Sequence, residues 1–217
     1  MEFKKKELAD LRENYGIATL LESDVDKNPF IQFQKWIETA IKEKIVDPNA
    51  MTLATVGADG QPSARTVLLK NYSSNGFVFF TNYDSKKGIQ MAENERVTLL
   101  FWWKELERQV RIEGRAQKVS VEDSKFYFHA RPKGSQISAF ISPQSKPVIR
   151  ESLEKSFLEM IEKYELIDKI PFPSNWGGYN IEPHLFEFWQ GRPNRLHDRL
   201  QFTLDESKEW KIERLGP

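Results

Sequence analysis

Residues 51–82 read MTLATVGADGQPSARTVLLKNYSSNGFVFFTN, and their pattern indicates strands joined by tight turns. Runs rich in β-branched and aromatic residues cover 51–56, 63–70 and 77–82. Asp59-Gly60 and Asn75-Gly76 separate these runs, and Asp59-Gly60 is expected to supply the positive φ angles of a tight turn. The segment therefore predicts antiparallel hairpins.

The chain on either side of this segment adds helices and further strands. Apolar positions from Phe30 to Ile45 follow helical spacing, with Asn28 as a plausible N-cap and Pro29 in the first turn. Further helices are predicted at 85–93, 121–130, 136–140 and 147–164. Further strands are predicted at 97–103, 107–119, 178–189, 198–204 and 210–215. Within 107–119, one face is expected to carry Val110, Ile112, Gly114 and Ala116, and the other Gln109, Arg111, Glu113 and Arg115.

Strands that arrive as hairpins, rather than as alternating strand-helix-strand units, favour an antiparallel barrel over a doubly wound parallel sheet. The sequence thus predicts a mainly β protein with added helices (α+β) and about seven or eight strands. Turn formers between Glu22 and Pro29 follow a polar beginning. We therefore expect residues 1–20 to form a mobile N-terminal arm and residues 21–217 to form a single domain.

Composition excludes several classes of protein. The chain has 217 residues, 32 Lys+Arg against 32 Asp+Glu, and no Cys, so disulfides, thiol nucleophiles and cysteine metal sites are absent. No apolar run approaches the ~20 residues that span a bilayer, so no membrane insertion is expected. The N-terminus carries no secretory signal pattern, and a cytoplasmic location is expected. Zero net charge argues against a nucleic-acid binder.

Common catalytic motifs are also missing. The sequence has no GxGxxG after a strand, no phosphate-binding GxxxxGK[ST], no HExxH and no GxSxG. Its three histidines, His129, His184 and His197, are far apart and lack ligand-like spacing, so no metal site is predicted.

Cations and hydroxyls are dense in segments that should be structured. Arg65 and Lys70 stand near the two ends of one predicted strand, where their opposite parity would place them on opposite faces unless a bulge or the strand end intervenes. Two ordinary surface cations would give the same pattern.

In 80–87, FTNYDSKK, a strand end runs into a helix start capped by Asp84 or Ser85. Lys86 and Lys87 in the first helical turn oppose the helix dipole, unless an anion also binds there. Free backbone N–H groups, two ammonium groups and the Thr81 hydroxyl would hold a phosphate, although a solvated lysine pair remains an alternative.

In 127–135, YFHARPKGS, Tyr127 and Arg131 are four apart on one helical face, and Ser135 is expected to cap the next helix. A phenol, a guanidinium and a helix N-terminus suit a second phosphate site. An ordinary helix corner is the alternative.

In 186–199, FEFWQGRPNRLHDR, an aromatic strand enters a loop that is crowded with cations. Arg192, Arg195, His197 and Arg199 lie within eight residues, which suggests recognition of a charged ligand, with Trp189 available to stack. A solvated loop is the alternative.

Taken in order, six segments resemble the pyridoxamine 5'-phosphate oxidase family, and the resemblance extends from residue 11 to the end of the chain. They are ARTVLLK, FFTNYDSKK, LERQVRIEG, YFHARPKGSQISAFISPQS, FWQG and NRLHDR. The resemblance implies a homodimeric FMN-binding split β-barrel with FMN at the subunit interface. It implies oxidation of pyridoxamine or pyridoxine 5'-phosphate to pyridoxal 5'-phosphate, with O2 as acceptor and H2O2 as product.

The resemblance also implies roles for residues. Those that would hold FMN are Arg65, Thr66, Val67, Leu68, Leu69, Lys70, Phe80, Thr81, Lys86, Lys87 and Gln109, with Gln144, Ser145, Trp189 and Arg199 from the partner chain. Those that would meet the substrate are Arg12, Tyr15, Lys70, Tyr127, Arg131, Ser135, Arg195 and His197. Arg195 and His197 are expected to act in catalysis by orienting the ring and assisting proton removal. Arg12 and Tyr15 match an N-terminal segment that can close as a lid.

Two departures from the family pattern are visible. Lys86 stands where the family usually has Arg, which exchanges a bidentate phosphate contact for a point charge, and Phe80 replaces a frequent Tyr. Two other functions stay open: a flavin reductase of the same barrel type with another substrate, and a non-catalytic binder of FMN or pyridoxal phosphate.

Overall fold

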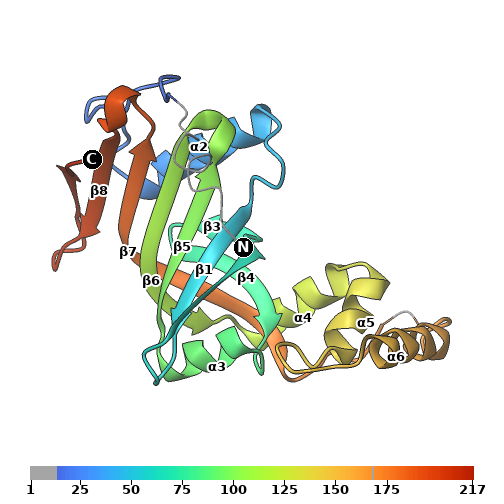
Figure 1. Ribbon diagram of the computed structural model, residues 1–217. Helices are drawn as coiled ribbons and strands as arrows, with labels where there is room; N and C mark the ends of the chain where they lie inside the picture. The colour runs from blue at the N-terminus through green and yellow to red at the C-terminus, as the bar shows by residue number, and fades with distance from the viewer. Residues whose placement is uncertain (1–13, 168) are drawn as a thin grey trace, which may run out of the picture. The chain divides into compact units, whose positions relative to one another are not determined.

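The computed structural model describes residues 14–167 and 169–217 (Figure 1). Two compact units are distinguished, and each is described by itself. The first unit comprises the described residues up to Pro48, together with 100–112 and 185–217. The second unit comprises 49–99 and the described part of 113–184. The expectation of a mobile arm over 1–20 and a single domain over 21–217 stays a prediction.

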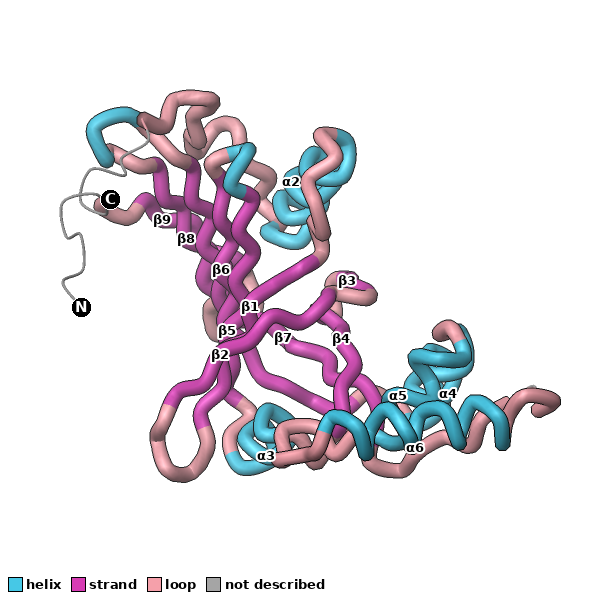
Figure 2. The backbone as a smooth tube through the Cα atoms, turned by 45° about the vertical axis from the view of Figure 1, so that its right-hand side comes forward, coloured by secondary structure: helices cyan, strands magenta, loops and turns pink. Residues whose placement is uncertain are grey.

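The described residues form a nine-stranded sheet in the order β2-β1-β5-β6-β7-β4-β3, with β8 on β7 and β9 on β8 (Figure 2). The strands are β1 (Ala50–Val56), β2 (Pro62–Leu68), β3 (Asn71–Ser73), β4 (Gly76–Asn82), β5 (Arg96–Trp103), β6 (Arg108–Lys118), β7 (Trp176–Gln190), β8 (Asp198–Leu204) and β9 (Trp210–Arg214). The predicted strands are all present, and β3 was missed because three residues are too few to show a period. Val110, Ile112, Gly114 and Ala116 of β6 are buried, as their alternation predicts.

The hairpin of β1 and β2 belongs to the second unit and pairs Leu53 with Arg65. Its turn needs one left-handed residue rather than two: Gly60 has φ +72°, whereas Asp59 has no positive φ. The reason is loop length, because five residues separate the paired Val56 and Pro62, and longer hairpin loops do not require the two-residue turn geometry.

The chain leaves the regular strand before it reaches Lys70. β2 ends at Leu68, after which Leu69 N–H donates to the Asn49 carbonyl (2.9 Å) and Lys70 N–H donates to the Val78 carbonyl (2.8 Å). Strand alternation therefore does not apply between Arg65 and Lys70, and the strand end removes their parity conflict.

Four helices belong to the second unit: α3 (Lys86–Glu93), α4 (Val121–Ala130), α5 (Lys133–Ile141) and α6 (Arg150–Lys163). Figure 1 shows α4, α5 and α6 gathered together. Phe128 of α4, Ile137 of α5 and Trp176 of β7 are buried in one cluster beneath them. These contacts fix the corner between α4 and α5.

Helix α5 begins earlier than predicted. It starts at Lys133 rather than 136, because Pro132 takes the N-cap position with φ −52° and ψ 144°. Ser135 therefore lies in the first turn, with its N–H donating to the Pro132 carbonyl (2.9 Å), and does not cap the helix. Gly134 also lies inside α5.

Helix α2 (Pro29–Lys42) belongs to the first unit, and its start is as predicted: the Asn28 side chain accepts from Phe30 N–H (2.9 Å). It ends before the predicted Ile45, because Lys44 adopts a left-handed φ of 56°. Its apolar face packs in the core of this unit, with Phe33 against Phe101 (5.0 Å between ring centroids) and Trp36 against Phe188 (5.2 Å).

Candidate functional site

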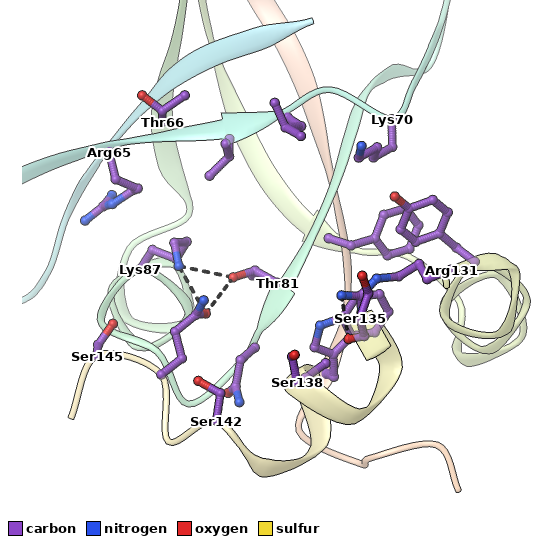
Figure 3. A pocket seen from close by; sticks show the side chains of 18 of the residues that line it. Arg65, Thr66, Lys70, Thr81, Lys87, Arg131, Ser135, Ser138, Ser142 and Ser145 are labelled. Carbon is purple, nitrogen blue, oxygen red and sulfur yellow. Dashed lines mark hydrogen bonds between the residues drawn. The ribbon is translucent and has the colours of Figure 1, made fainter. Parts of the chain in front are cut away.

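A cavity of about 920 Å³ lies in the second unit, a size that suits organic ligands (Figure 3). Many of the predicted binding residues line this one cavity: Arg65, Thr66, Val67, Leu68, Lys70, Phe80, Thr81, Lys86, Lys87, Tyr127, Arg131, Ser135, Gln144 and Ser145. Leu69 is 5% exposed and is not among the lining residues. Figure 3 shows Arg65 and Lys87 on one side of the cavity and Lys70, Arg131 and Ser135 on the other.

Arg65 and Lys87 form the first cation group. Arg65 Nη1 donates to the Thr55 hydroxyl (2.6 Å) and to the Leu53 and Ser63 carbonyls (both 3.2 Å). Lys87 is only 8% exposed, and its Nζ donates to Thr81 Oγ1 (3.2 Å) and to two further oxygens, Ser85 Oγ and Gln144 Oε1 (both 3.3 Å).

The electrostatics around Arg65 and Lys87 favour a bound anion. Burial lowers the pKa of Lys87, and the nearby Arg65 lowers that pKa further. Burial also lowers the pKa of Arg65. Among the residues that the structure describes, no carboxylate forms a salt bridge with either cation. The Ser85-capped start of α3 lies beside them and places Lys86 and Lys87 in its first turn. Two cations and a helix N-terminus without a carboxylate suit a phosphate.

Gln144 and Ser145 follow α5 and line the cavity of their own chain. The resemblance implied that the partner chain would supply them. Within this chain, Thr81 Oγ1 and Lys87 Nζ donate to Gln144 Oε1, because the loop after α5 passes the start of α3. The supply of these two residues to FMN by a partner chain stays a prediction.

Arg131 is the centre of the second cation group. Its Nη2 donates to the Ser135 carbonyl (2.8 Å), and its guanidinium lies over the Trp176 ring (4.8 Å to the centroid). Its Nη1 is buried and has no hydrogen-bond partner among the described residues, and burial lowers the pKa of the group. An unsatisfied buried donor is costly, so this atom fits a ligand acceptor such as a phosphate oxygen. Lys70, Tyr127 and Ser135 line the cavity with it.

Stacked rings form one wall of the cavity. Phe80 stacks on Tyr127 (4.0 Å between centroids) and on Trp176 (5.5 Å). Sequence reasoning missed Trp176, although a tryptophan directly before Gly177-Gly178 was a usable signal. Other lining residues that it missed are Asn82, Pro132, Ser138, Ala139 and Ser142.

The predicted catalytic pair lies in the first unit, on a loop with a left-handed backbone. Asn194 and Arg195 have φ of 57° and 62°, conformations that cost energy in residues other than glycine. The Arg192 N–H donates to His197 Nδ1 (3.1 Å), so a neutral His197 carries its proton on Nε2. Burial lowers the pKa of His197 below 6.5, and Arg195 lowers it further.

Aromatic rings surround His197. Its ring lies 4.6 Å from Trp189 and 5.7 Å from Tyr15, and Tyr15 lies edge-on to Trp189 at 5.8 Å. Tyr15, Trp189 and His197 thus form one aromatic corner of the first unit. Arg12 lies outside the described residues.

Arg199 already has protein partners. It donates to both carboxylate oxygens of Glu187 (3.0 and 3.2 Å) and to the Gly216 carbonyl (2.8 Å). Glu187, 3% exposed, also accepts from Arg111 (2.6 Å). The two guanidiniums lower the pKa of Glu187 against the effect of burial. Gln109, on β6, belongs to the same unit.

The described chain contains neither a metal-binding cluster nor a membrane-spanning helix. Across residues 14–167 and 169–217, no group of three potential metal-ligating side chains occurs. Within the same residues, no helix has the length and apolar character needed to cross a membrane.

The chain matches known proteins along most of its length. Residues 37–160 match a family model described as pyridoxamine 5'-phosphate oxidase, and 176–217 match one described as the C-terminal dimerisation region of pyridoxine 5'-phosphate oxidase. The pyridoxine/pyridoxamine 5'-phosphate oxidases of Bordetella petrii and a Nostoc species are each 53% identical to the chain. The alignments cover 97% of the chain and 99% and 98% of the two relatives.

Solved structures support the fold. PhzG from Burkholderia lata, in complex with tetrahydrophenazine-1-carboxylic acid, matches with a TM-score of 0.86 and 28% identity, covering 93% of this chain and all of PhzG. A pyridoxamine 5'-phosphate oxidase-related, FMN-binding protein from Nostoc punctiforme matches with a TM-score of 0.69 and 20% identity, covering 85% of this chain and 97% of that protein. The predicted α+β split barrel is confirmed. With two family models along its length and relatives at half identity, the chain belongs to the pyridoxine/pyridoxamine 5'-phosphate oxidase family, a family of oxidoreductases.

Proposed function

We propose that this protein oxidises pyridoxamine 5'-phosphate and pyridoxine 5'-phosphate to pyridoxal 5'-phosphate with FMN as cofactor. O2 accepts the two electrons and becomes H2O2. The amine substrate also consumes water and releases ammonia, whereas the alcohol needs no water. The relatives' names support the substrates, and the FMN-binding neighbour supports the flavin.

One observation carries the proposal: a single cavity contains two separate cation groups that lack carboxylates. The reaction brings together two phosphorylated molecules, the cofactor and the substrate. Arg65 and Lys87 on one side and Arg131 on the other provide a site for each phosphate.

The residues of the first group fit FMN. In the proposal, Arg65, Lys86, Lys87 and Thr81 hold its phosphate, and the residues from Thr66 to Lys70 and Phe80 lie along the rest of the molecule. The fit rests on the buried Lys87, whose ammonium has only neutral oxygens as partners. Bound FMN would supply the redox chemistry, taking up a hydride from the substrate's C4' carbon and passing electrons to O2.

The chain's own residues bind and orient the substrate. Arg131, Ser135, Tyr127 and Lys70 anchor its phosphate, and anchoring raises the effective concentration of the reacting carbon. Arg195 and His197 meet the pyridine ring. Because Nδ1 of His197 accepts from the Arg192 N–H, a neutral His197 offers Nε2–H to the ring as a hydrogen-bond donor. His197 therefore orients the ring in this arrangement, and assistance in proton removal stays a prediction.

We further propose a homodimer with FMN at the subunit interface, to which Gln109, Trp189 and Arg199 contribute. The match of residues 176–217 to a dimerisation region supports the dimer. A cytoplasmic location stays a prediction.

The test is an absorbance spectrum of the purified protein, followed by addition of pyridoxamine 5'-phosphate under air. A yellow protein that forms both peroxide and the aldehyde is expected. A yellow protein that forms neither would keep the flavin site and overturn the substrate assignment, favouring a flavin reductase or a non-catalytic binder. A colourless protein that FMN cannot reconstitute would overturn both.

A further inference from the structure

Glu107 occupies an unusual place in the first unit. It follows the short 3-10 turn Lys104–Leu106 and has a left-handed backbone with φ 52° and ψ 38°. Glycine or asparagine is favoured in that region, and other residues there carry a conformational cost. Glu107 is nevertheless only 8% exposed, so its side chain is buried at a position where its backbone is strained.

The Glu107 carboxylate holds the N-terminal segment. One oxygen, Oε2, accepts from the backbone N–H of Gly16 (2.8 Å) and of Ile17 (3.1 Å). Two successive N–H groups on one carboxylate oxygen make charge-assisted hydrogen bonds, which are stronger than neutral ones. Both of these N–H groups are thus held by one side chain.

The backbone of Glu107 holds the other side of the same corner. Its carbonyl accepts from Gly191 N–H (2.7 Å), directly before the loop that contains Arg195 and His197. A Cβ at Gly191 would lie 2.8 Å from Tyr15 Cγ and 2.9 Å from Glu107 Cβ, closer than packed carbons approach. Gly191 therefore lets the N-terminal segment lie against the start of this loop.

The result is a fixed position for Tyr15, which lies edge-on to Trp189 and His197. We propose that Glu107 is a positioning residue, which acts through Gly16 and Ile17 to hold Tyr15 at the aromatic corner where the substrate ring is to bind. The inference rests on the proposed function, because it takes Tyr15 and His197 as substrate contacts. Glu107 itself touches no reacting atom.

The main test is Glu107→Gly, because glycine accepts the left-handed backbone while the side chain with its carboxylate is removed. We expect KM for pyridoxamine 5'-phosphate to rise about tenfold with kcat changed less than about twofold, since positioning contributes to binding. Glu107→Gln, which keeps an acceptor oxygen, should restore most of the affinity. Glu105→Ala removes an exposed carboxylate from the same turn and is the matched control.

A second readout does not depend on catalysis. Hydrogen exchange of the peptide that covers residues 14–20 should quicken about tenfold in Glu107→Gly and stay unchanged in Glu105→Ala. Gly191→Ala keeps the carboxylate but displaces Tyr15, and it should raise KM in the same way. This variant also keeps the test decisive if Glu107→Gly does not fold.

The outcomes separate the two claims. A wild-type protein that forms no pyridoxal 5'-phosphate would overturn the proposed function and the role of Glu107 with it. An active wild type, with KM and exchange unchanged in Glu107→Gly or with KM unchanged in Gly191→Ala, would overturn the role of Glu107 alone.

Discussion

Three cations of the cavity in the second unit differ in their partners from three arginines of the first unit, Arg111, Arg199 and Arg214. In the first unit, Arg111 and Arg199 share Glu187, and Arg214 pairs with Glu22 (2.7 Å) and Asp198 (2.8 Å). In the cavity, the described residues offer Arg65, Lys87 and Arg131 only hydroxyl, amide and carbonyl oxygens.

The difference separates cations whose charge a carboxylate of the fold neutralises from cations whose charge is left for a ligand. A guanidinium paired with a carboxylate is neutralised within the fold, and the pair stabilises the folded chain. Removing one member of the pair leaves the other as an uncompensated charge. A buried cation without a carboxylate keeps a desolvation cost that a bound anion offsets. Removing a carboxylate that neutralises a cation should therefore lower the free energy of unfolding. Removing a buried cation that has no carboxylate should leave it unchanged or raise it.

The largest effect is expected at Glu187. Glu187→Gln removes the shared carboxylate between two arginines whose side chains are each about a third exposed. The free energy of unfolding should fall by about 3 kcal/mol, the lower end for breaking a buried pair. Denaturant unfolding of the protein measures it. The exposed Arg150–Glu154 pair is the control, since Glu154→Gln should cost less than about 0.5 kcal/mol. Equal losses in both variants would refute the comparison.

The next effect is on cofactor affinity. Lys87→Met removes a buried ammonium, and the Kd for FMN should rise about 10- to 100-fold, as expected for lost charged hydrogen bonds. The unfolding free energy of the FMN-free protein should stay the same or rise, because an unpaired buried charge is gone. FMN fluorescence titration and denaturant unfolding give the two numbers, with exposed Lys155→Met as control. A destabilised FMN-free variant that binds FMN normally would place Lys87 among the cations that stabilise the fold.

The third effect concerns substrate selectivity. Arg131→Met should raise KM for pyridoxamine 5'-phosphate about tenfold and leave KM for unphosphorylated pyridoxamine nearly unchanged, because the guanidinium meets only the phosphate. Steady-state kinetics with both amines supply the ratio. An equal rise in KM for both amines would show that Arg131 shapes the cavity without binding the substrate phosphate.

The smallest effect is a shift in titration at His197. Burial and Arg195 lower its pKa below 6.5, so His197 is neutral at pH 7 and gains its proton only as the pH falls below 6.5. Arg195→Leu removes one cause, and the pKa should rise toward 6.5 without reaching it, because burial remains. NMR titration of the three histidines, assigned with His197→Asn, measures the shift. A pKa that falls in Arg195→Leu would contradict it.

Arg195→Leu also bears on catalysis. Turnover should fall more than FMN content does, because Arg195 is placed at the substrate and not at the flavin phosphate. A variant that purifies colourless yet keeps normal turnover per remaining flavin would contradict this placement.

Sequence patterns were sufficient for the strands and for two clusters of candidate phosphate contacts, 80–87 and 127–135, because each depends on neighbours in the chain. The sequence could not show which cations are paired with a carboxylate. Arg111 and Glu187 are 76 positions apart, and only the folded sheet brings them together. The Arg65/Lys70 conflict had the same origin, since the end of β2 depends on hydrogen bonds to Asn49 and Val78. Glu107 gave no signal, because its partners are backbone N–H groups far away in sequence.

The unneutralised cations of the cavity have a kinetic consequence. The chain as a whole has a formal net charge of zero, so it exerts little long-range attraction on anions. Arg65, Lys87 and Arg131 create a local positive potential at the cavity instead, and such a field raises the encounter rate of anionic ligands. Added salt shortens the reach of that field to about 8 Å at physiological ionic strength. FMN and phosphorylated vitamers should therefore associate more slowly as salt is added, whereas unphosphorylated pyridoxamine should enter at a rate that salt barely changes.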